Sequence, residues 1–73
     1  MEVALTKREM QVVALTDRGL SNKEIARELD LEISTIKNHA HSILAKYNVR
    51  RRVQAAAVFK KQNKGFEPTG KRR

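Results

Sequence analysis

Apolar residues recur at helical spacing in four stretches of the chain, and polar or turn-forming residues separate these stretches. The third stretch, at about residues 33–46, has the clearest pattern, with apolar side chains at positions i, i+4, i+7, i+8 and i+11: Ile36, Ala40, Ile43, Leu44 and Tyr47. A helix with this spacing buries one stripe and leaves its opposite face free. We therefore predict a helix with two unlike faces in the middle of the chain.

Two capping boxes predict where the first two helices begin. Thr6 precedes Glu9 by three residues, and Ser21 precedes Glu24 by three, so each pair can satisfy free amides at a helix start. Gly19 can adopt the left-handed conformation that ends the first helix. A short connection then joins the second helix to the third, whose outer face is polar and basic. Two helices joined by so tight a turn match the helix-turn-helix pattern.

A fourth helix is predicted over residues 51–61, after Asn48 ends the third helix in a left-handed conformation. Its inward stripe is predicted to contain Val53, Ala56 and Ala57. A helix with a second apolar face usually buries that face too, so a second copy of the chain would meet it in a symmetric dimer. The alternative is that these are ordinary exposed apolar residues. The predicted dimer surface consists of four residues: Gln54, Ala55, Val58 and Phe59.

The length of 73 residues allows one small domain, and the few aromatic residues require an aliphatic core. We therefore predict an all-α, compact four-helix domain over residues 1–61 and a basic, disordered tail over residues 62–73. Phe66 is the tail residue that could dock on the body. No apolar run reaches the roughly 20 residues of a membrane span, so we expect a soluble, cytoplasmic protein.

Several ionisable side chains have a structural and a functional interpretation. Arg8 and Glu9 lie where an ion pair between helices would fix packing, although two solvated charges are an equally good interpretation. His39 and His41 are two residues apart and diverge on a helix, and no nearby carboxylate completes a set of metal ligands. With no cysteine in the chain, we predict no metal site, no disulfide and no cofactor.

Charge is distributed unevenly along the chain. Residues 1–33 hold five basic and seven acidic side chains, whereas residues 34–73 hold eleven basic and one acidic. This gradient favours an acidic macromolecule that meets the second half, and nucleic acid is the commonest such partner for a small domain. An anionic membrane would need a basic helix with a wide exposed apolar face, and the polar face of the third helix is too mixed for that.

The polar face of the third helix carries side chains that can read base edges in DNA. Lys37 and His41 can donate hydrogen bonds to guanine, and Asn38 can pair with adenine through two hydrogen bonds. Ser42 and Ala45 are small enough to allow close approach. The alternative is a face that only meets water, but the charge gradient favours DNA.

Five blocks of this sequence resemble, in order and spacing, the signatures of the LuxR-type (GerE-like) helix-turn-helix domains of bacterial transcription regulators. They extend from residue 5 to about residue 58 and read Leu5-Thr6-x-Arg8-Glu9, Gly19-Leu20-Ser21-Asn22-Lys23-Glu24-Ile25-Ala26, Thr35-Ile36-Lys37-Asn38-His39, Ile43-Leu44-x-Lys46 and Val49-x-x-Arg52-x-Gln54-Ala55. The resemblance implies that the third helix enters the major groove, that the second helps to hold the backbone, and that the fourth mediates dimerisation.

The resemblance also implies roles for individual residues. Lys37, Asn38 and His41 occupy base-reading positions, and His39 is assigned a packed or phosphate-facing role. We predict phosphate contacts for five residues: Asn22, Lys23, Ser34, Thr35 and Lys46. The sequence departs from the family pattern at Glu32, Tyr47-Asn48 and Arg51, which weakens helix capping and leaves the predicted DNA face unchanged.

We therefore predict a sequence-specific, double-stranded DNA-binding module of a bacterial transcription regulator, acting at the nucleoid as a dimer on two half-sites about one helical turn apart. The alternative is an interaction module that contacts RNA polymerase or another regulator and binds DNA weakly. An enzyme is not expected, because the sequence has no nucleophile–base pair and no glycine-rich phosphate loop. We also expect no small-molecule ligand in this chain. The four residues before residue 5 do not resemble the family's usual regulatory domain, so we expect either an effector domain of a larger regulator or a stand-alone regulator.

Overall fold

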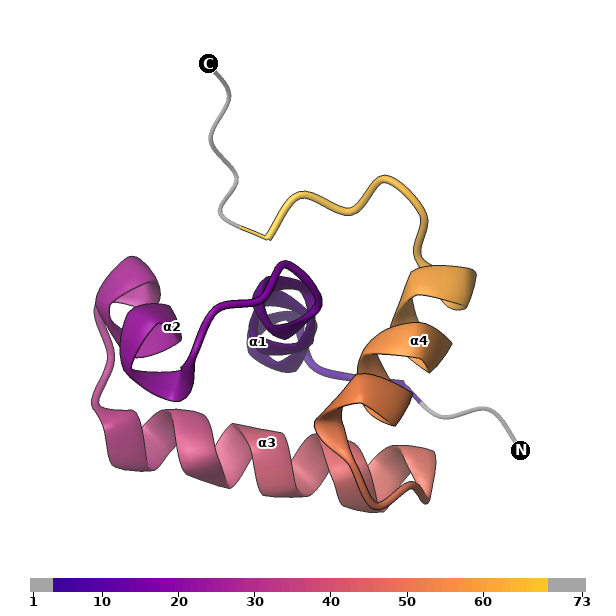
Figure 1. Ribbon diagram of the computed structural model, residues 1–73, viewed down its shortest axis with the longest axis horizontal. Helices are drawn as coiled ribbons and strands as arrows, with labels where there is room; N and C mark the ends of the chain where they lie inside the picture. The colour runs from indigo at the N-terminus through magenta and orange to yellow at the C-terminus, as the bar shows by residue number, and fades with distance from the viewer. Residues whose placement is uncertain (1–3, 69–73) are drawn as a thin grey trace.

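The computed structural model describes residues 4–68, which contain four helices and no strand (Figure 1). The predicted all-α, four-helix fold is confirmed. Residues 1–3 of the predicted domain and residues 69–73 of the predicted tail lie outside the described part. The helices are α1 (Lys7–Asp17), α2 (Asn22–Leu29), α3 (Ile33–Tyr47) and α4 (Arg52–Gln62).

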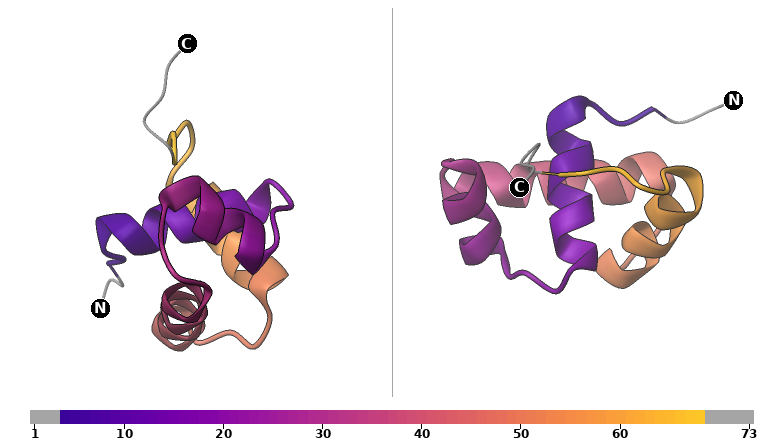
Figure 2. Two further views of the ribbon diagram at one scale, coloured as in Figure 1. Left: turned by 90° about the vertical axis from the view of Figure 1, so that its left-hand side faces the viewer. Right: turned by 90° about the horizontal axis from the view of Figure 1, so that it is seen from above.

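Helix α3 forms one side of the molecule, and the other three helices lie on the same side of it (Figure 1). Seen from above, α1 crosses over α3, while α2 and α4 lie near its two ends (Figure 2). Helix α1 packs against the other three helices, and α2 does not pack against α4. This arrangement leaves one long face of α3 without a neighbouring helix.

Both predicted capping boxes are present. Thr6 Oγ1 accepts a hydrogen bond from the backbone amide of Glu9 at 3.1 Å, and the amide of Thr6 donates to Glu9 Oε1 at 2.9 Å. Ser21 and Glu24 repeat this exchange at 3.1 and 2.8 Å. Gly19 has a φ of 93°, as expected for the residue that turns the chain away from α1.

Helices α2 and α3 end in the same way, each with a C-cap residue other than glycine in the left-handed conformation. Asp30 and Asn48 have φ values of 59° and 56°, in the left-handed region that Asp and Asn tolerate better than most residues. The next residue, Leu31 or Val49, donates its amide to a carbonyl oxygen of the last helical turn, at 2.8 and 3.0 Å respectively. Both side chains also pack against the core, so each helix end is closed by an apolar plug.

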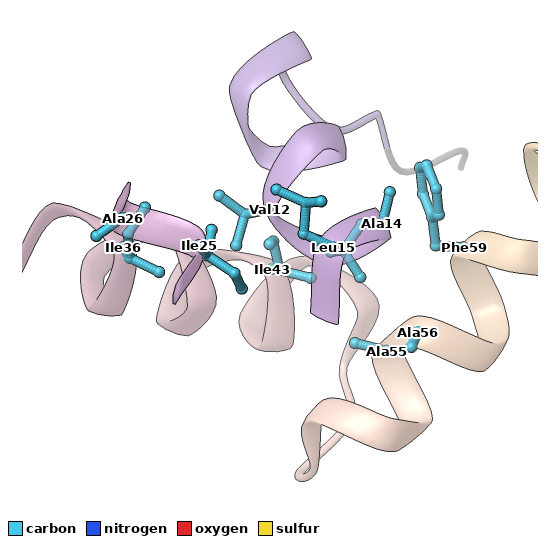
Figure 3. Close-up of a cluster of buried hydrophobic side chains, with 11 residues drawn as sticks. Val12, Ala14, Leu15, Ile25, Ala26, Ile36, Ile43, Ala55, Ala56 and Phe59 are labelled. Carbon is cyan, nitrogen blue, oxygen red and sulfur yellow. The ribbon is translucent and has the colours of Figure 1, made fainter. Parts of the chain in front are cut away.

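The core joins residues from all four helices (Figure 3). Ile25 of α2 and Ile36 of α3 are completely buried. Figure 3 shows Ile36 and Ile43 directed from α3 toward the side chains of α2 and α1. The buried apolar residues are Val12, Val13, Ala14, Leu15, Ile25, Ala26, Ile36, Ile43, Ala55, Ala56 and Phe59.

The orientation predicted for α4 is wrong except at Ala56, which is buried as predicted. Val53, which was expected to face inward, is 69% exposed, and Ala57 is also exposed. Ala55 and Phe59, which were predicted to meet a second copy, are only 2% and 4% exposed and belong to the core of a single chain. Apolar residues surround most of this alanine-rich helix, so their periodicity does not distinguish one face from another. Phe59, the largest of them, lies on the face that α4 buries.

Gln54, a third residue of the predicted dimer surface, caps the start of α4. Its Oε1 atom accepts hydrogen bonds from the backbone amides of Arg50 at 3.1 Å and Arg51 at 2.9 Å. Gln54 therefore holds the two residues that precede α4. Arg51 itself cannot accept a bond from an amide of the first turn, because a guanidinium group has no hydrogen-bond acceptor.

The sequence predicts a disordered tail, but residues 63–68, which we call the C-terminal strap, lie against the body of the domain. The strap runs from the end of α4 back across α1 (Figures 1 and 2). Phe66 packs edge-on against Phe59 with ring centroids 5.6 Å apart, and Pro68 is buried. A surface ion pair of 3.5 Å joins Glu67 to Arg18. The docking of two apolar side chains holds the strap on the body of the domain.

Candidate nucleic-acid interface

The face of α3 that no helix covers carries the three predicted base-reading residues. Lys37, Asn38 and His41 are exposed, and they lie opposite the buried Ile36 and Ile43. Their spacing of one to four residues places them side by side over about one turn of the helix. The structure therefore brings these three residues together on one accessible face.

Small, uncharged side chains lie at the two ends of this face. Ser34 is exposed and Thr35 is half-buried in the first turn of α3, and Ala45 is exposed near its end. Glu32, the residue before the helix, makes no side-chain hydrogen bond to the first turn, so α3 lacks the side-chain cap that α1 and α2 have. Free amides therefore remain at the start of α3, close to Ser34.

Ser42 and Lys46 of α3 bind a buried carboxylate of α1. Ser42 Oγ donates to Glu9 Oε2 at 2.6 Å, and Lys46 Nζ donates to Glu9 Oε1 at 2.8 Å. Glu9 is only 4% exposed. Of the two interpretations of Glu9, the ion pair between helices is therefore confirmed. Ser42 does not project from the free face of α3 as expected, because it contacts α1.

These contacts determine the charge state of Glu9. Burial by itself raises the pKa of Glu9, but hydrogen bonds from Lys46, Ser42 and the amide of Thr6 outweigh burial and lower the pKa to about 2. The Glu9 charge also affects a neighbouring side chain. The pKa of Tyr47 is raised mainly by burial, and the Glu9 carboxylate raises it further. Glu9 is thus ionised at neutral pH, as the ion pair with Lys46 requires. Lys46 is about one-third exposed, so part of its ammonium group still faces solvent.

The start of α2 presents free amides beside polar side chains. Ser21 takes up the amide of Glu24, which leaves the amides of Asn22 and Lys23 in the first turn without a helical acceptor. Lys23 is exposed, and Asn22 is half-buried. The Asn22 side chain accepts a hydrogen bond from Arg52 Nη2 of α4. The predicted phosphate-contacting residues of α2 therefore stand at a helix N-terminus, where anions are stabilised.

Two arginines beside this site were missing from the predicted set. Arg50 and Arg51 are exposed in the turn between α3 and α4, and Arg52 follows them as the first residue of α4. The bond from Arg52 to Asn22 shows that this turn reaches the same edge of the molecule as the start of α2. The run of three arginines is visible in the sequence, but only the fold indicates which helix it approaches.

A shallow hollow lies between the end of α1 and the outer side of α4. Its volume is about 360 Å³. The exposed side chains of Val53 and Ala57 form its apolar part, and Asp17 and Lys60 form an ion pair of 3.7 Å in its wall. The hollow therefore combines an apolar floor with charges of both signs at its margin.

In residues 4–68, no helix is long and apolar enough to cross a membrane. No group of three or more potential metal ligands was found in the same residues.

Comparison with known proteins gives the chain a family. Residues 3–59 match the family described as "Bacterial regulatory proteins, luxR family". The transcriptional regulatory protein LiaR of Bacillus subtilis is 47% identical over 53 residues, which cover 73% of this chain and 25% of LiaR. The nitrate/nitrite response regulator protein NarP of Escherichia coli is 45% identical over 58 residues, or 80% of this chain and 27% of NarP.

A third relative, the response regulator protein VraR of Staphylococcus aureus, is 45% identical over 51 residues, or 70% of this chain and 24% of VraR. The chain thus spans about a quarter of the length of these relatives. The resemblance seen in the five sequence blocks is confirmed by a match that covers most of the chain. The chain belongs to the LuxR family of bacterial regulatory proteins and comprises a helix-turn-helix domain of the kind with which they bind DNA and regulate transcription.

Proposed function

We propose that this domain binds double-stranded DNA sequence-specifically, with the free face of α3 in the major groove. The observation that carries the proposal is the exposure of Lys37, Asn38 and His41 on one face, opposite a buried stripe. An α-helix fits the major groove, where each base pair presents its own pattern of donors and acceptors. Lys37 and His41 donate to guanine, and Asn38 pairs with adenine.

Phosphate contacts hold α3 in register with the bases. We assign these contacts to Asn22, Lys23, Ser34, Thr35 and Lys46, as predicted from the sequence, and we add two exposed arginines of the α3–α4 turn, Arg50 and Arg51. Lys46 can serve DNA and Glu9 together, because an ammonium group has three donors and this one is partly exposed. A DNA target means that the protein acts in the bacterial cytoplasm, at the nucleoid.

We further propose that two copies bind two half-sites through a surface of α4 that differs from the predicted one. Since Ala55 and Phe59 are buried, the surface is centred on the exposed Val53 and Ala57. These two residues are four apart, share one side of the helix and line the hollow beside α1. An exposed, large apolar side chain rimmed by charges suits an isologous contact between two copies.

The proposal is tested by an NMR titration of the chain with a duplex of about 20 base pairs, roughly two helical turns, at low salt. Amide shifts are expected in α3, at the start of α2 and in the α3–α4 turn. Selection from a pool of random duplexes should then enrich one motif. Shifts confined to the residues after Gln62, which carry four basic side chains and one acidic, without an enriched motif, would overturn the proposal. They would favour the alternative function, a module that contacts RNA polymerase or another regulator.

A further inference from the structure

One side-chain hydrogen bond connects α4 with α2. Arg52 Nη2, at the first position of α4, donates to Oδ1 of Asn22, at the first position of α2. The two helices do not pack against each other. Between their residues, all of which the structure describes, no other side-chain hydrogen bond or ion pair is formed. Apart from the Arg52 bond, α2 and α4 are therefore connected only through α1 and α3.

The chemistry of the two groups determines how the Asn22 amide is oriented. A guanidinium group only donates hydrogen bonds, so the carbonyl half of the Asn22 amide must face Arg52. The Nδ2 half is then left as a donor, and no acceptor for it is found among residues 4–68. Beside it lie the free backbone amides of Asn22 and Lys23 and the exposed Lys23 side chain. All of these neighbours favour an anion.

Packing restrains the Arg52 side chain. Arg52 is half-buried and lines a small apolar gap between α1, α3 and α4 together with Val12 and Ile43. A long side chain that is held by packing loses little further freedom when it forms a hydrogen bond. The guanidinium group is therefore a firm support for Asn22.

We propose that Arg52 is a positioning residue for DNA binding, which holds the Asn22 amide so that its Nδ2 group donates to a DNA phosphate. This inference rests on the proposed function, because it names one of its contacts and the group that orients it. Arg52 acts through Asn22 and does not itself touch the DNA. As a result, the start of α4 and the phosphate contact of α2 are mechanically linked.

Asn22→Asp separates the positioning contact from the phosphate contact. Aspartate keeps an acceptor for Arg52, adds an ionic attraction to it and suits the start of a helix, so the variant should be at least as resistant to urea as the wild type. It loses the Nδ2 donor and places a negative charge beside the phosphate. We therefore expect its affinity for DNA to fall by more than about tenfold.

The experiment measures the binding of the 73-residue chain to a mixed-sequence duplex of about 20 base pairs over a series of salt concentrations. The variants are Asn22→Asp, Asn22→Ala, Arg52→Gln and the double variant Asn22→Ala/Arg52→Gln. Each alanine or glutamine variant should lose about tenfold in affinity, because one hydrogen bond to a charged group is lost. The double variant should lose no more affinity than the single variant that binds DNA more weakly. Its slope of log affinity against log salt should equal that of the wild type.

Two outcomes would overturn the inference. In the first, Asn22→Asp binds as well as the wild type, which shows that Asn22 makes no phosphate contact. Alternatively, the losses could add in the double variant while Arg52→Gln lowers the slope of log affinity against log salt by about 0.9, which would show that Arg52 neutralises a phosphate itself. Failure of the wild-type chain to bind the duplex is a distinct result, since it overturns the proposed function and this inference with it.

Discussion

Lys46 Nζ lies 2.8 Å from Glu9 Oε1, so an ion pair connects the last turn of α3 with the first turn of α1. Ser42, one helical turn earlier, binds the other oxygen of the same carboxylate at 2.6 Å. The two contacts prevent α3 from rotating about its axis relative to α1. The direction in which Lys37, Asn38 and His41 point therefore depends on a buried negative charge.

This charge should make the stability of the domain depend on acid pH. The pKa of Glu9 is lowered from 4.5 to about 2 on folding, so the carboxylate stabilises the fold above pH 4.5, and this contribution is lost as the pH falls toward 2. Its size at neutral pH is about 3 kcal/mol. Urea denaturation at pH 7 and pH 3 should show the part of this loss that occurs above pH 3, about 2 kcal/mol, in the wild type and a much smaller loss in Glu9→Gln.

The control for this experiment is Glu28→Gln, which changes an exposed carboxylate. It should retain the acid dependence of the wild type. An unchanged acid dependence in Glu9→Gln would show that Glu9 does not govern stability in acid.

The base-reading assignment predicts a change in sequence preference. Lys37→Ala or Asn38→Ala should each cost about 1–3 kcal/mol of binding free energy on the preferred site and relax the preference at one base pair. Competition binding with single-base variants of the site measures both effects. Lys61→Ala, which removes an exposed charge from the last turn of α4, is the control and should leave the preference unchanged. Wild-type preference in both α3 variants would remove them from the base-reading set.

The phosphate assignment predicts a change in salt dependence without a change in sequence preference. Lys23→Ala should lower the slope of log affinity against log salt by about 0.9, since one phosphate is no longer neutralised. It should weaken binding to all duplexes alike. If Lys61→Ala lowers the slope by the same amount, the basic charge acts without a defined docking position.

The revised dimer surface predicts that Val53→Glu removes the contact between two copies but leaves DNA binding by one copy intact. Val53 is 69% exposed, so a charged residue there should leave the free energy of unfolding within about 0.5 kcal/mol of the wild type. Binding to a single half-site should persist, while cooperative binding to two adjacent half-sites is lost. Gel-shift titrations of one-site and two-site duplexes distinguish these effects. Cooperative binding by Val53→Glu would place the contact between copies elsewhere.

Much of the fold could be predicted from the sequence because local chemistry determines it. Thr6 with Glu9 and Ser21 with Glu24 form the predicted caps, and Asn48 has the predicted left-handed conformation. The face of α4 could not be predicted, because alanine gives little contrast between one side of a helix and another. Which residues α4 buries is decided by its contact with α1.

The candidate site was predictable to a similar extent. The exposure of Lys37, Asn38 and His41 follows from the spacing of the apolar residues in α3. The bonds from Ser42 and Lys46 to Glu9 join residues more than 30 positions apart, and no local pattern predicts which carboxylate they reach. For the same reason, the link between Arg52 and Asn22 was not foreseen.

The C-terminal strap should contribute to stability without contributing to DNA binding. Phe66→Ala removes the edge-on contact with Phe59, which should cost about 1–3 kcal/mol in the free energy of unfolding. Affinity for duplex DNA should remain that of the wild type under conditions where both proteins are folded. The midpoint of urea denaturation measures the first effect, and an unchanged midpoint would show that the strap does not hold to the body.

The bonds that Ser42 and Lys46 form with Glu9 also determine how the target sequence of this domain could be reprogrammed. Exchanging α3 for a helix that lacks the serine and the lysine at these two positions would leave a buried carboxylate unpaired, and an unpaired buried charge is strongly destabilising. Positions 37, 38 and 41 are exposed and make no contact with the core, so substitutions there are free of this penalty. A library restricted to these three positions should therefore yield folded proteins with new preferences, whereas one that includes positions 42 and 46 should yield many unfolded ones.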